Sequence, residues 1–138
     1  MSQPARMDSA SPLGGVRVVL VDDHAGVRDV ISHLLARFGA SVTAVSGVPE
    51  ALEALEREQP DVLISDVEMP GEDGFALIRK LRALPPERGG EIPAVALTGL
   101  QSADARARIL QAGFQSHVSK PVDARALTAV VTRLAARE

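Results

Sequence analysis

The feature that most constrains the fold of this chain is a fivefold alternation between short apolar runs and longer stretches with helical periodicity. Each apolar run holds four to six residues, and about half of these residues are β-branched. The runs occupy positions 16–21, 41–45, 62–65, 94–97 and 116–119. Runs of this length and composition are typical of strands that are buried on both faces. The chain is therefore predicted to contain five strands, each followed by a helix.

The stretch after the first predicted strand gives the clearest helical pattern. Its apolar residues recur at spacings of three and four, and Gly39 follows as a stop signal. Ser46 can cap a second helix, which Pro60 ends. The three remaining predicted helices cover 74–84, 102–112 and 123–137.

Strands that are separated by helices predict a parallel sheet, because a parallel neighbour cannot be reached through a tight turn. We therefore expect an α/β fold, a doubly wound, flavodoxin-like (βα)5 sandwich with strand order 2-1-3-4-5. In this order the winding reverses between strands one and three. Ligands bind beyond the carboxyl ends of the strands at such a reversal, so those two strand ends are the first place to look for a site.

Composition limits the class of protein. The 138 residues suit one domain, with 1–15, rich in Ser, Pro, Ala and Gly, as a flexible tail or linker and 16–138 as the folded domain. The absence of cysteine fits a reducing cytoplasm, and the apolar runs are too short to span a membrane. A net charge of −3 and only three aromatic residues argue against direct binding of nucleic acid.

Three carboxylates are predicted to meet at the reversal. Asp22 and Asp23 follow the first strand, and Asp66 follows the third. Two unit charges about 4 Å apart repel by roughly 4 kcal/mol at an effective dielectric of about 20, so the cluster requires protons or a cation. Oxygen ligands favour a hard cation such as Mg²⁺, while the direction of His24 is left open. Taken alone, the acidic pair could equally be solvated loop residues or helix caps.

Two further groups fall on the same rim of the predicted sheet. Thr98 follows the fourth strand and Lys120 follows the fifth. A carboxylate nucleophile, a metal and a fixed cation are the parts that phosphoryl transfer requires. The cluster is therefore interpreted as a phosphoryl-accepting site with Asp66 at its centre.

Four motifs resemble the receiver domains of response regulators. They are VVLVDDH at 18–24, DVLISDVEMPGEDGF at 61–75, VALTG at 95–99 and HVSKP at 117–121. The resemblance covers nearly the whole predicted domain. The chain is also similar to receivers attached to hybrid sensor histidine kinases, although a stand-alone regulator suits the motifs nearly as well.

The resemblance implies specific roles at the acidic cluster. Asp66 would be the phosphoacceptor, Asp23 would bind Mg²⁺ directly, and Asp22 would act mainly through a metal-bound water. The backbone carbonyl of Glu68 would be the third protein ligand. Gly74 would provide a flexible corner into the third helix.

The resemblance also implies roles around the phosphoryl group. Lys120 and Thr98 would contact it, with a cis peptide bond before Pro121. Glu68 and Leu100 would tune how fast the phosphoryl group is lost, while Gly99 would leave access to the acceptor open. His117 stands where relatives often carry Tyr or Phe that moves inward on activation.

The function implied is Mg²⁺-dependent transfer of a phosphoryl group from a sensor histidine kinase or a histidine phosphotransfer protein to Asp66. Transfer would switch the face formed by the fourth helix, the fifth strand and the fifth helix, toward a downstream partner that the sequence does not identify. Such a domain is not a dedicated enzyme, but it catalyses its own phosphorylation and dephosphorylation.

Three other functions agree less well with the sequence. A phosphatase of the haloacid dehalogenase kind carries its nucleophilic aspartate after the first strand, whereas here the acidic pair comes first. A nucleotide-binding domain would require a Gly-rich phosphate loop at the start of a helix, and no predicted helix begins with one. An interaction module that cannot be phosphorylated would have little use for the full acidic set.

Overall fold

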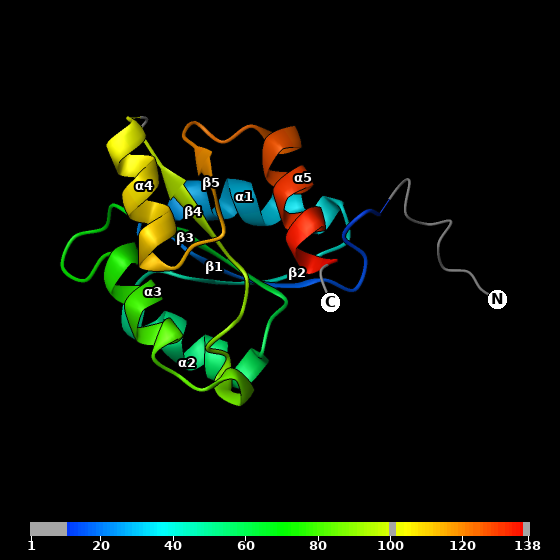
Figure 1. Ribbon diagram of the computed structural model, residues 1–138. Coiled ribbons are helices and arrows are strands. Elements are labelled where there is room, and N and C mark those ends of the chain that lie inside the picture. Colours follow the sequence, from blue (N-terminus) through cyan, green and yellow to red (C-terminus); the bar gives the residue numbers. More distant parts are fainter. Residues whose placement is uncertain (1–10, 100–101, 137–138) are drawn as a thin grey trace.

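A central sheet with helices on both sides forms the core of the computed structural model, which describes residues 11–99 and 102–136 (Figure 1). The strands are β1 (Arg17–Val21), β2 (Ser41–Val45), β3 (Val62–Asp66), β4 (Ala94–Thr98) and β5 (Ser116–Ser119). The helices are α1 (Ala25–Arg37), α2 (Val48–Glu58), α3 (Gly74–Arg82), α4 (Ala103–Ala112) and α5 (Ala124–Ala135), with a 3₁₀ turn η2 (Pro86–Arg88) before β4. None of the helices in the described ranges is long and apolar enough to cross a bilayer.

The sheet confirms the predicted topology. All neighbouring strands pair in parallel, in the order β2-β1-β3-β4-β5. The register places Val21 of β1 opposite Ser65 of β3. The residues that follow these two partners are Asp22 and Asp66, so the register itself brings the two carboxylates together.

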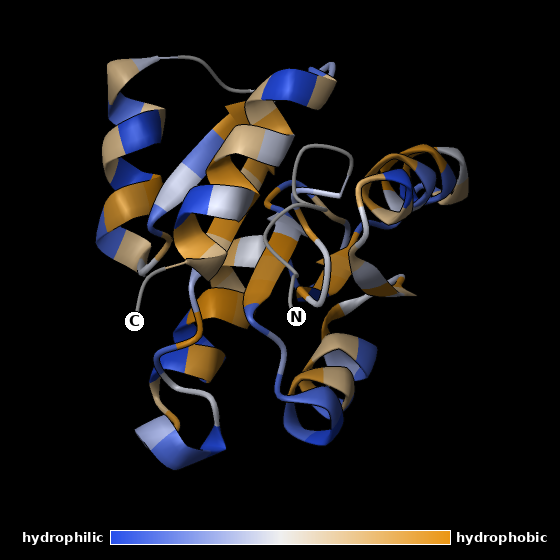
Figure 2. Ribbon diagram, turned by 90° about the vertical axis from the view of Figure 1, so that its right-hand side faces the viewer, coloured by the Kyte–Doolittle hydropathy of each residue, from blue (hydrophilic) through white to orange (hydrophobic). Residues whose placement is uncertain are grey.

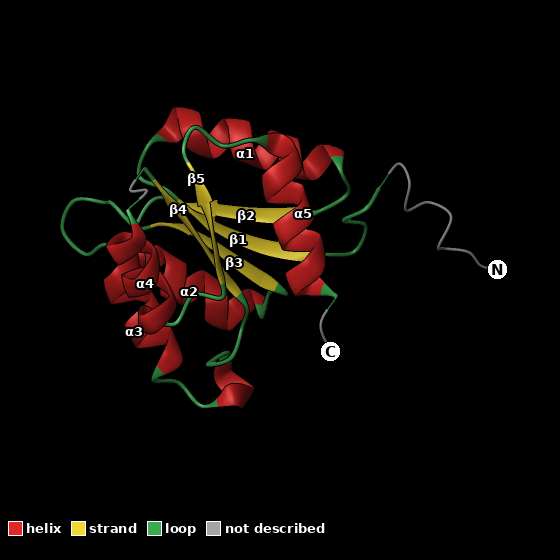
Figure 3. Cartoon of the chain, turned by 45° about the horizontal axis from the view of Figure 1, so that its top comes forward, coloured by secondary structure: helices red, strands yellow, loops and turns green. Residues whose placement is uncertain are grey.

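Alternation along each strand divides the apolar core into two layers. Val18 and Leu20 of β1 pack with α1 and α5, while Val19 and Val21 pack with α2, α3 and α4. Figure 3 shows α1 and α5 on one face of the sheet and the other three helices on the opposite face. The apolar strands lie between helices whose outer faces are hydrophilic (Figure 2). Both faces of β3 and β4 are buried, which explains why their sequences begin with unbroken apolar runs rather than alternating.

The segment before β1 differs from the expected tail. Residues 1–10 lie outside the described residues, but 11–15 form a turn that packs on the domain. Leu13 is fully buried against the α1–α5 layer, and its backbone N–H donates a 2.8 Å hydrogen bond to the carbonyl of Phe38. The packed part of the chain therefore begins before position 16, because one leucine within a polar segment is enough to anchor that segment.

The helix starts also depart in part from the sequence interpretation. Asp73, Ser102 and Asp123 cap α3, α4 and α5 through side-chain hydrogen bonds to backbone N–H groups. For α2, however, the N-cap is Gly47 with no side-chain bond, rather than Ser46.

Candidate functional site

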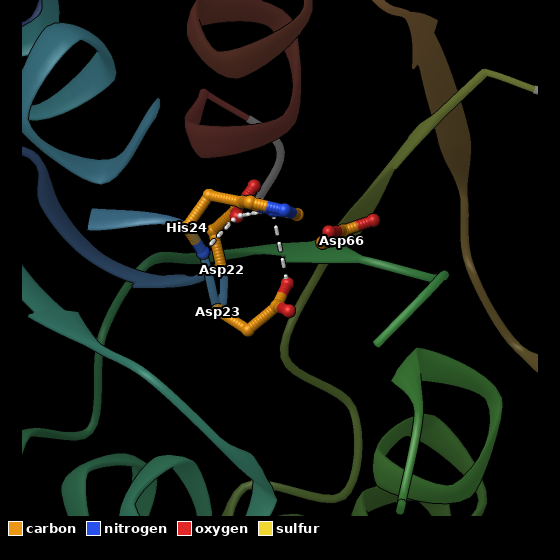
Figure 4. A group of neighbouring side chains, drawn as sticks. All are labelled: Asp22, Asp23, His24 and Asp66. Carbon is orange, nitrogen blue, oxygen red and sulfur yellow. Dashed lines mark hydrogen bonds and ion pairs between the residues drawn. The ribbon is translucent and has the colours of Figure 1, made fainter. Parts of the chain in front are cut away.

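The carboxyl ends of β1 and β3 bring four side chains of metal-ligating types into one cluster (Figure 4). Asp22, Asp23 and His24 follow β1, and Asp66 ends β3. Each of the four offers one ligand atom, and these atoms all lie within 4.8 Å of one another. The strand order thus assembles the acidic cluster that the sequence predicted.

The two central carboxylates are buried without being fully hydrogen-bonded. Asp22 and Asp66 are both completely inaccessible to solvent. Oδ1 of Asp22 accepts from the backbone N–H of His24 at 2.9 Å, and Oδ1 of Asp66 accepts from the N–H of Glu68 at 3.0 Å. In the described part of the chain, the buried Oδ2 of each carboxylate and the buried Oδ1 of Asp23 have no polar contact beyond ion pairs with Lys120 and His24. Such oxygens are expensive to bury, so this set is suited to a cation.

Lys120 supplies the positive charge of the site. Its Nζ lies 3.0 Å from Oδ2 of Asp66 and 3.6 Å from Oδ2 of Asp22, both ion-pair contacts. The backbone N–H of Lys120 donates to the carbonyl of Thr98 at 2.8 Å, and the Lys120–Pro121 peptide bond is cis. The end of β4 therefore fixes the position from which the lysine reaches the carboxylates.

The electrostatics of the site favour a proton or a cation at Asp66. Burial raises the pKa of Asp66, and this effect outweighs the hydrogen bond from Glu68 and the charge of Lys120. Burial by itself would lower the pKa of Lys120, but the carboxylates of Asp66, Asp22 and Glu68 more than offset it and raise that pKa. Lys120 therefore stays charged, yet one lysine does not neutralise the cluster.

The other residues that were given roles around the phosphoryl group lie on or near β4 and β5. Thr98 is buried at the last position of β4, and His117 is half-buried on β5, opposite Ala96. Gly99 follows Thr98, and its backbone N–H donates to Oε1 of the exposed Glu68 at 3.3 Å. Leu100, expected to tune the loss of the phosphoryl group, lies outside the described residues.

Gly74 is required for a reason other than the flexibility expected from the sequence. A Cβ at this position would lie 2.4 Å from the carbonyl oxygen of Asp66 and 2.7 Å from the Cα of Val67. The first turn of α3 therefore packs directly on the backbone that carries Asp66. A side chain here would displace the backbone of Asp66 itself.

Two features of the site were not foreseen in the sequence. The ring of His24 turns toward the carboxylates, with Nδ1 3.3 Å from Oδ1 of Asp23 and 3.5 Å from Oδ1 of Asp22. Arg28, one turn into α1, donates a 2.7 Å hydrogen bond to the backbone carbonyl of Asp22. The sequence shows that His24 follows an acidic pair and that Arg28 lies one helical turn further on. It does not show where either side chain points.

Comparison with known proteins places this geometry in a family. Residues 18–132 match the response regulator receiver domain. An uncharacterised 14.6 kDa protein of Leptolyngbya boryana is 42% identical over 111 residues, which are 80% of this chain and 83% of that protein. The sensor protein GacS of Pseudomonas syringae pv. syringae is 36% identical over 131 residues, which are 93% of this chain but 14% of GacS.

A solved structure shows the same fold with a metal. The receiver domain of a sensor histidine kinase from Pseudomonas aeruginosa, determined with a magnesium ion coordinated in its active-site cleft, has a TM-score of 0.80 and 30% identity. The alignment covers 90% of this chain and 100% of that domain. Among the larger relatives, hybrid kinases and transcription regulators, this chain spans only 8–24% of the full length. Because the family match extends over most of the folded residues and the most similar of these relatives is matched along most of its own length, the chain belongs to the response regulator receiver domain family of two-component signalling systems.

Proposed function

We propose that Asp66 accepts a phosphoryl group from a phosphohistidine donor in a Mg²⁺-dependent reaction. The observation that carries this proposal is a fully buried carboxylate that lies beside two further carboxylates and is paired with the ammonium of Lys120 at 3.0 Å. In the transfer, one oxygen of Asp66 bonds to phosphorus as the phosphorus–nitrogen bond of the donor breaks. The donor imidazole leaves with the electron pair of that bond.

The residues around Asp66 suit the charge that the reaction moves. Asp22, Asp23, Asp66 and the backbone carbonyl of Glu68 would hold Mg²⁺, since oxygen-only ligands that retain some waters fit this cation. When bound, Mg²⁺ supplies charge neutralisation at the phosphoryl oxygens. Lys120 would pair with a phosphoryl oxygen, and Thr98 would donate its hydroxyl to another. The domain would thereby catalyse its own phosphorylation and dephosphorylation without being a dedicated enzyme.

An apolar hollow beside the site suits the donor protein. It lies between the first turns of α1 and the segment after β5, and is lined by Gly26, Val27, Val30, Ile31, Lys120, Pro121 and Val122. Val30 is 65% exposed, which is unusual for a large aliphatic side chain on this domain. Because Lys120 belongs to both the hollow and the ion pair with Asp66, a partner helix seated there would present its phosphohistidine to the acceptor. Such a helix would come from a sensor histidine kinase or a histidine phosphotransfer protein.

Phosphorylation would switch the face formed by α4, β5 and α5. Thr98 and His117 lie on β4 and β5 at the root of this face, and Gly99 leads from β4 toward α4. If Thr98 turns toward the phosphoryl group, His117 would move inward as the mobile ring. The carboxylate of Glu68 would have to release the N–H of Gly99, so Glu68, with Leu100, would tune the lifetime of the phosphoryl group. A downstream protein would read the shifted population, and a cytoplasmic location would suit both partners.

The test is intact-mass measurement after treatment with acetyl phosphate and Mg²⁺. The wild type should gain one phosphoryl group, and Asp66→Asn should gain none. Asp61→Asn, at the opposite end of the same strand, is the matched control and should react like the wild type. An Asp66→Asn protein that is still phosphorylated would remove Asp66 from its proposed role.

The switch has a separate test in backbone chemical shifts. Beryllofluoride binding should shift resonances from Asp66 through α4 and β5. Shifts restricted to the metal-binding loops would instead indicate an acceptor without an output face.

A further inference from the structure

The helix α4 is held on the domain by little apolar burial. Of its ten residues, all of which the structure describes, only Ala105 and Ile109 are buried, and Leu110 is 54% exposed. Its neighbour α3 lies on the same face of the sheet (Figure 3) and buries three large aliphatic side chains. Because so little apolar surface fixes α4, its polar and cationic contacts with α3 have a large share in setting its position.

The carboxyl end of α4 is tied to the rest of the domain by Arg82 of α3. Nε and Nη2 of Arg82 donate hydrogen bonds of 3.0 and 2.8 Å to the carbonyl of Gly113, the C-cap residue of α4. Nη1 donates to the carbonyl of Gly90 at 2.9 Å, and Nη2 also donates to Oε1 of Gln115 at 3.0 Å. A planar guanidinium shared among three partners holds all of them in place. The carboxyl end of α4 is therefore anchored.

A second contact between the two helices lies half-way along α4. The guanidinium of Arg108 lies over the ring of Phe75, 4.7 Å from the ring centroid. Phe75 is itself fixed, because it packs against the buried core and follows Gly74, which packs on the backbone of Asp66. Arg108 is exposed, so this cation–π contact can break without unpacking the core.

We propose that α4 pivots about its anchored carboxyl end when the acceptor is modified, and that the contact between Arg108 and Phe75 is the restraint that holds α4 in its resting position. The inference rests on the proposed function, in which Asp66 is phosphorylated and the face formed by α4, β5 and α5 changes. It adds the part of the chain that resists this change and so sets how readily the domain switches.

The movement begins at the amino end of α4. When Glu68 releases the N–H of Gly99, a 3.3 Å hydrogen bond is lost and the chain that leads from β4 to α4 is free to change direction. At a rise of about 1.5 Å per residue, Arg108 lies about 7.5 Å from the pivot at Gly113, and Ala103 lies about 15 Å from it. A swing of about 2.6 Å at Ala103 away from α3 therefore moves Arg108 by about 1.3 Å. Starting from 4.7 Å, the guanidinium then reaches the limit of about 6 Å for a cation–π contact.

A contact that exists only in the resting position opposes the switch. Its removal shifts the equilibrium toward the switched position by the factor that the contact contributes. For an exposed cation–π contact this factor is about two to five. A ligand that binds the switched state gains affinity by the same factor while that state is the minority. Mg²⁺ gains nothing, since none of its proposed ligands lies on α3 or α4.

The alternative is that Arg108 is a surface charge that stabilises both positions of α4 equally. The two roles differ in what removal of the cation does. A charge that favours neither position leaves the affinity for a ligand of the switched state unchanged. A restraint on the resting position, once removed, makes that ligand bind more tightly.

The experiment is calorimetric titration of the full chain with beryllofluoride in saturating Mg²⁺, for wild type, Arg108→Gln, Phe75→Leu and the double variant. Arg108→Gln removes the cation from an exposed position, and Phe75→Leu removes the ring but keeps an apolar side chain. Arg37→Gln makes the same change of charge at an exposed position of α1, on the opposite face of the sheet, and is the matched control.

We expect Arg108→Gln and Phe75→Leu each to bind beryllofluoride about two- to fivefold more tightly than the wild type. The double variant should bind no more tightly than the tighter of the two, because both substitutions remove the same contact. Arg37→Gln should match the wild type, and all variants should bind Mg²⁺ equally. Unchanged or weaker binding by Arg108→Gln, or an equal gain from it in the Phe75→Leu background, would overturn the inference.

Backbone chemical shifts test the pivot independently. On beryllofluoride binding, the shifts should decrease along α4 from Asp104 to Ala112, and the Nε–H resonance of Arg82 should stay in place. Equal shifts along α4, or a displaced Arg82 resonance, would overturn the pivot while leaving the acceptor intact. A wild type that binds Mg²⁺ but not beryllofluoride would overturn the proposed function, and this inference with it.

Discussion

The two ends of β3 carry an aspartate each, and the two residues could hardly differ more in their surroundings. Asp61, just before the strand, is exposed, and its Oδ2 accepts a 2.8 Å hydrogen bond from the backbone N–H of Arg17. Arg17 in turn pairs with Glu58 at 2.8 Å. Asp66, at the other end of the strand, is fully buried beside two further carboxylates, and its Oδ2 pairs with Lys120 at 3.0 Å.

This difference indicates that the amino end of β3 contributes to stability, whereas its carboxyl end carries the candidate site. At the amino ends of the strands, charges have partners and solvent, and the nearby Leu13 is buried. At the carboxyl ends, three carboxylates crowd together around one lysine, an arrangement that costs folding free energy. A domain whose stability comes from its core and its amino edge can maintain an unsatisfied site at the opposite edge.

The largest effect is expected at the amino edge. Leu13→Ala should lower the free energy of unfolding by about 2–5 kcal/mol, because it empties a fully buried position. Urea unfolding would measure the loss, and phosphorylation by acetyl phosphate should persist in conditions where the variant is folded. A loss below about 1 kcal/mol would mean that residues 11–15 behave as the flexible tail predicted from the sequence.

The next effect concerns metal binding at the carboxyl edge. Asp23→Ala should reduce the affinity for Mg²⁺ by about tenfold or more, since the remaining carboxylates cannot supply the same charge to a close octahedral site. Asp61→Ala is the matched control at the other edge and should bind Mg²⁺ as the wild type does. Calorimetric titration decides the question, and wild-type affinity in Asp23→Ala would make Asp23 a purely structural residue.

A smaller effect should appear in metal-free stability. Asp66→Asn should raise the free energy of unfolding by about 1 kcal/mol at neutral pH, because it removes a buried charge that lies beside Asp22. The same substitution at Asp61 retains the acceptor oxygen at an exposed position and should change stability by less than about 0.5 kcal/mol. Destabilisation by Asp66→Asn in urea unfolding would contradict the view that the acceptor is held at an energetic cost.

The smallest effect is the pH dependence of the stability that Asp66→Asn gains over the wild type. The pKa of Asp66 is raised in the folded state above its ordinary value of 3.8, so between the two values the folded protein binds more protons than the unfolded chain. Wild-type stability should therefore fall as the pH rises through this interval, and the advantage of Asp66→Asn should grow over it and then level off. Urea unfolding at a series of pH values measures this trend. If the stability gained by Asp66→Asn did not depend on pH, the gain would have a cause other than removal of the charge.

Much of the molecule could be predicted from local sequence. The strands are short, mainly apolar runs and the helices carry apolar stripes, so the five βα units are read directly from periodicity. Order and parallel pairing follow from the crossovers, and the convergence of Asp22 and Asp66 follows from that order. The segment around Leu13 was misjudged because its composition is that of a linker, and composition does not reveal what one side chain packs against.

The sequence by itself determined which chemical groups reach the rim of the sheet, because strand ends and strand order fix their backbone positions. Only the tertiary structure decided which carboxylates are buried beside Lys120, where the ring of His24 turns, and why position 74 excludes a side chain. The physical reason is that burial, side-chain direction and close approach depend on neighbours far away in sequence. These neighbours come into contact only when the chain folds, so the pattern along the sequence does not reveal them.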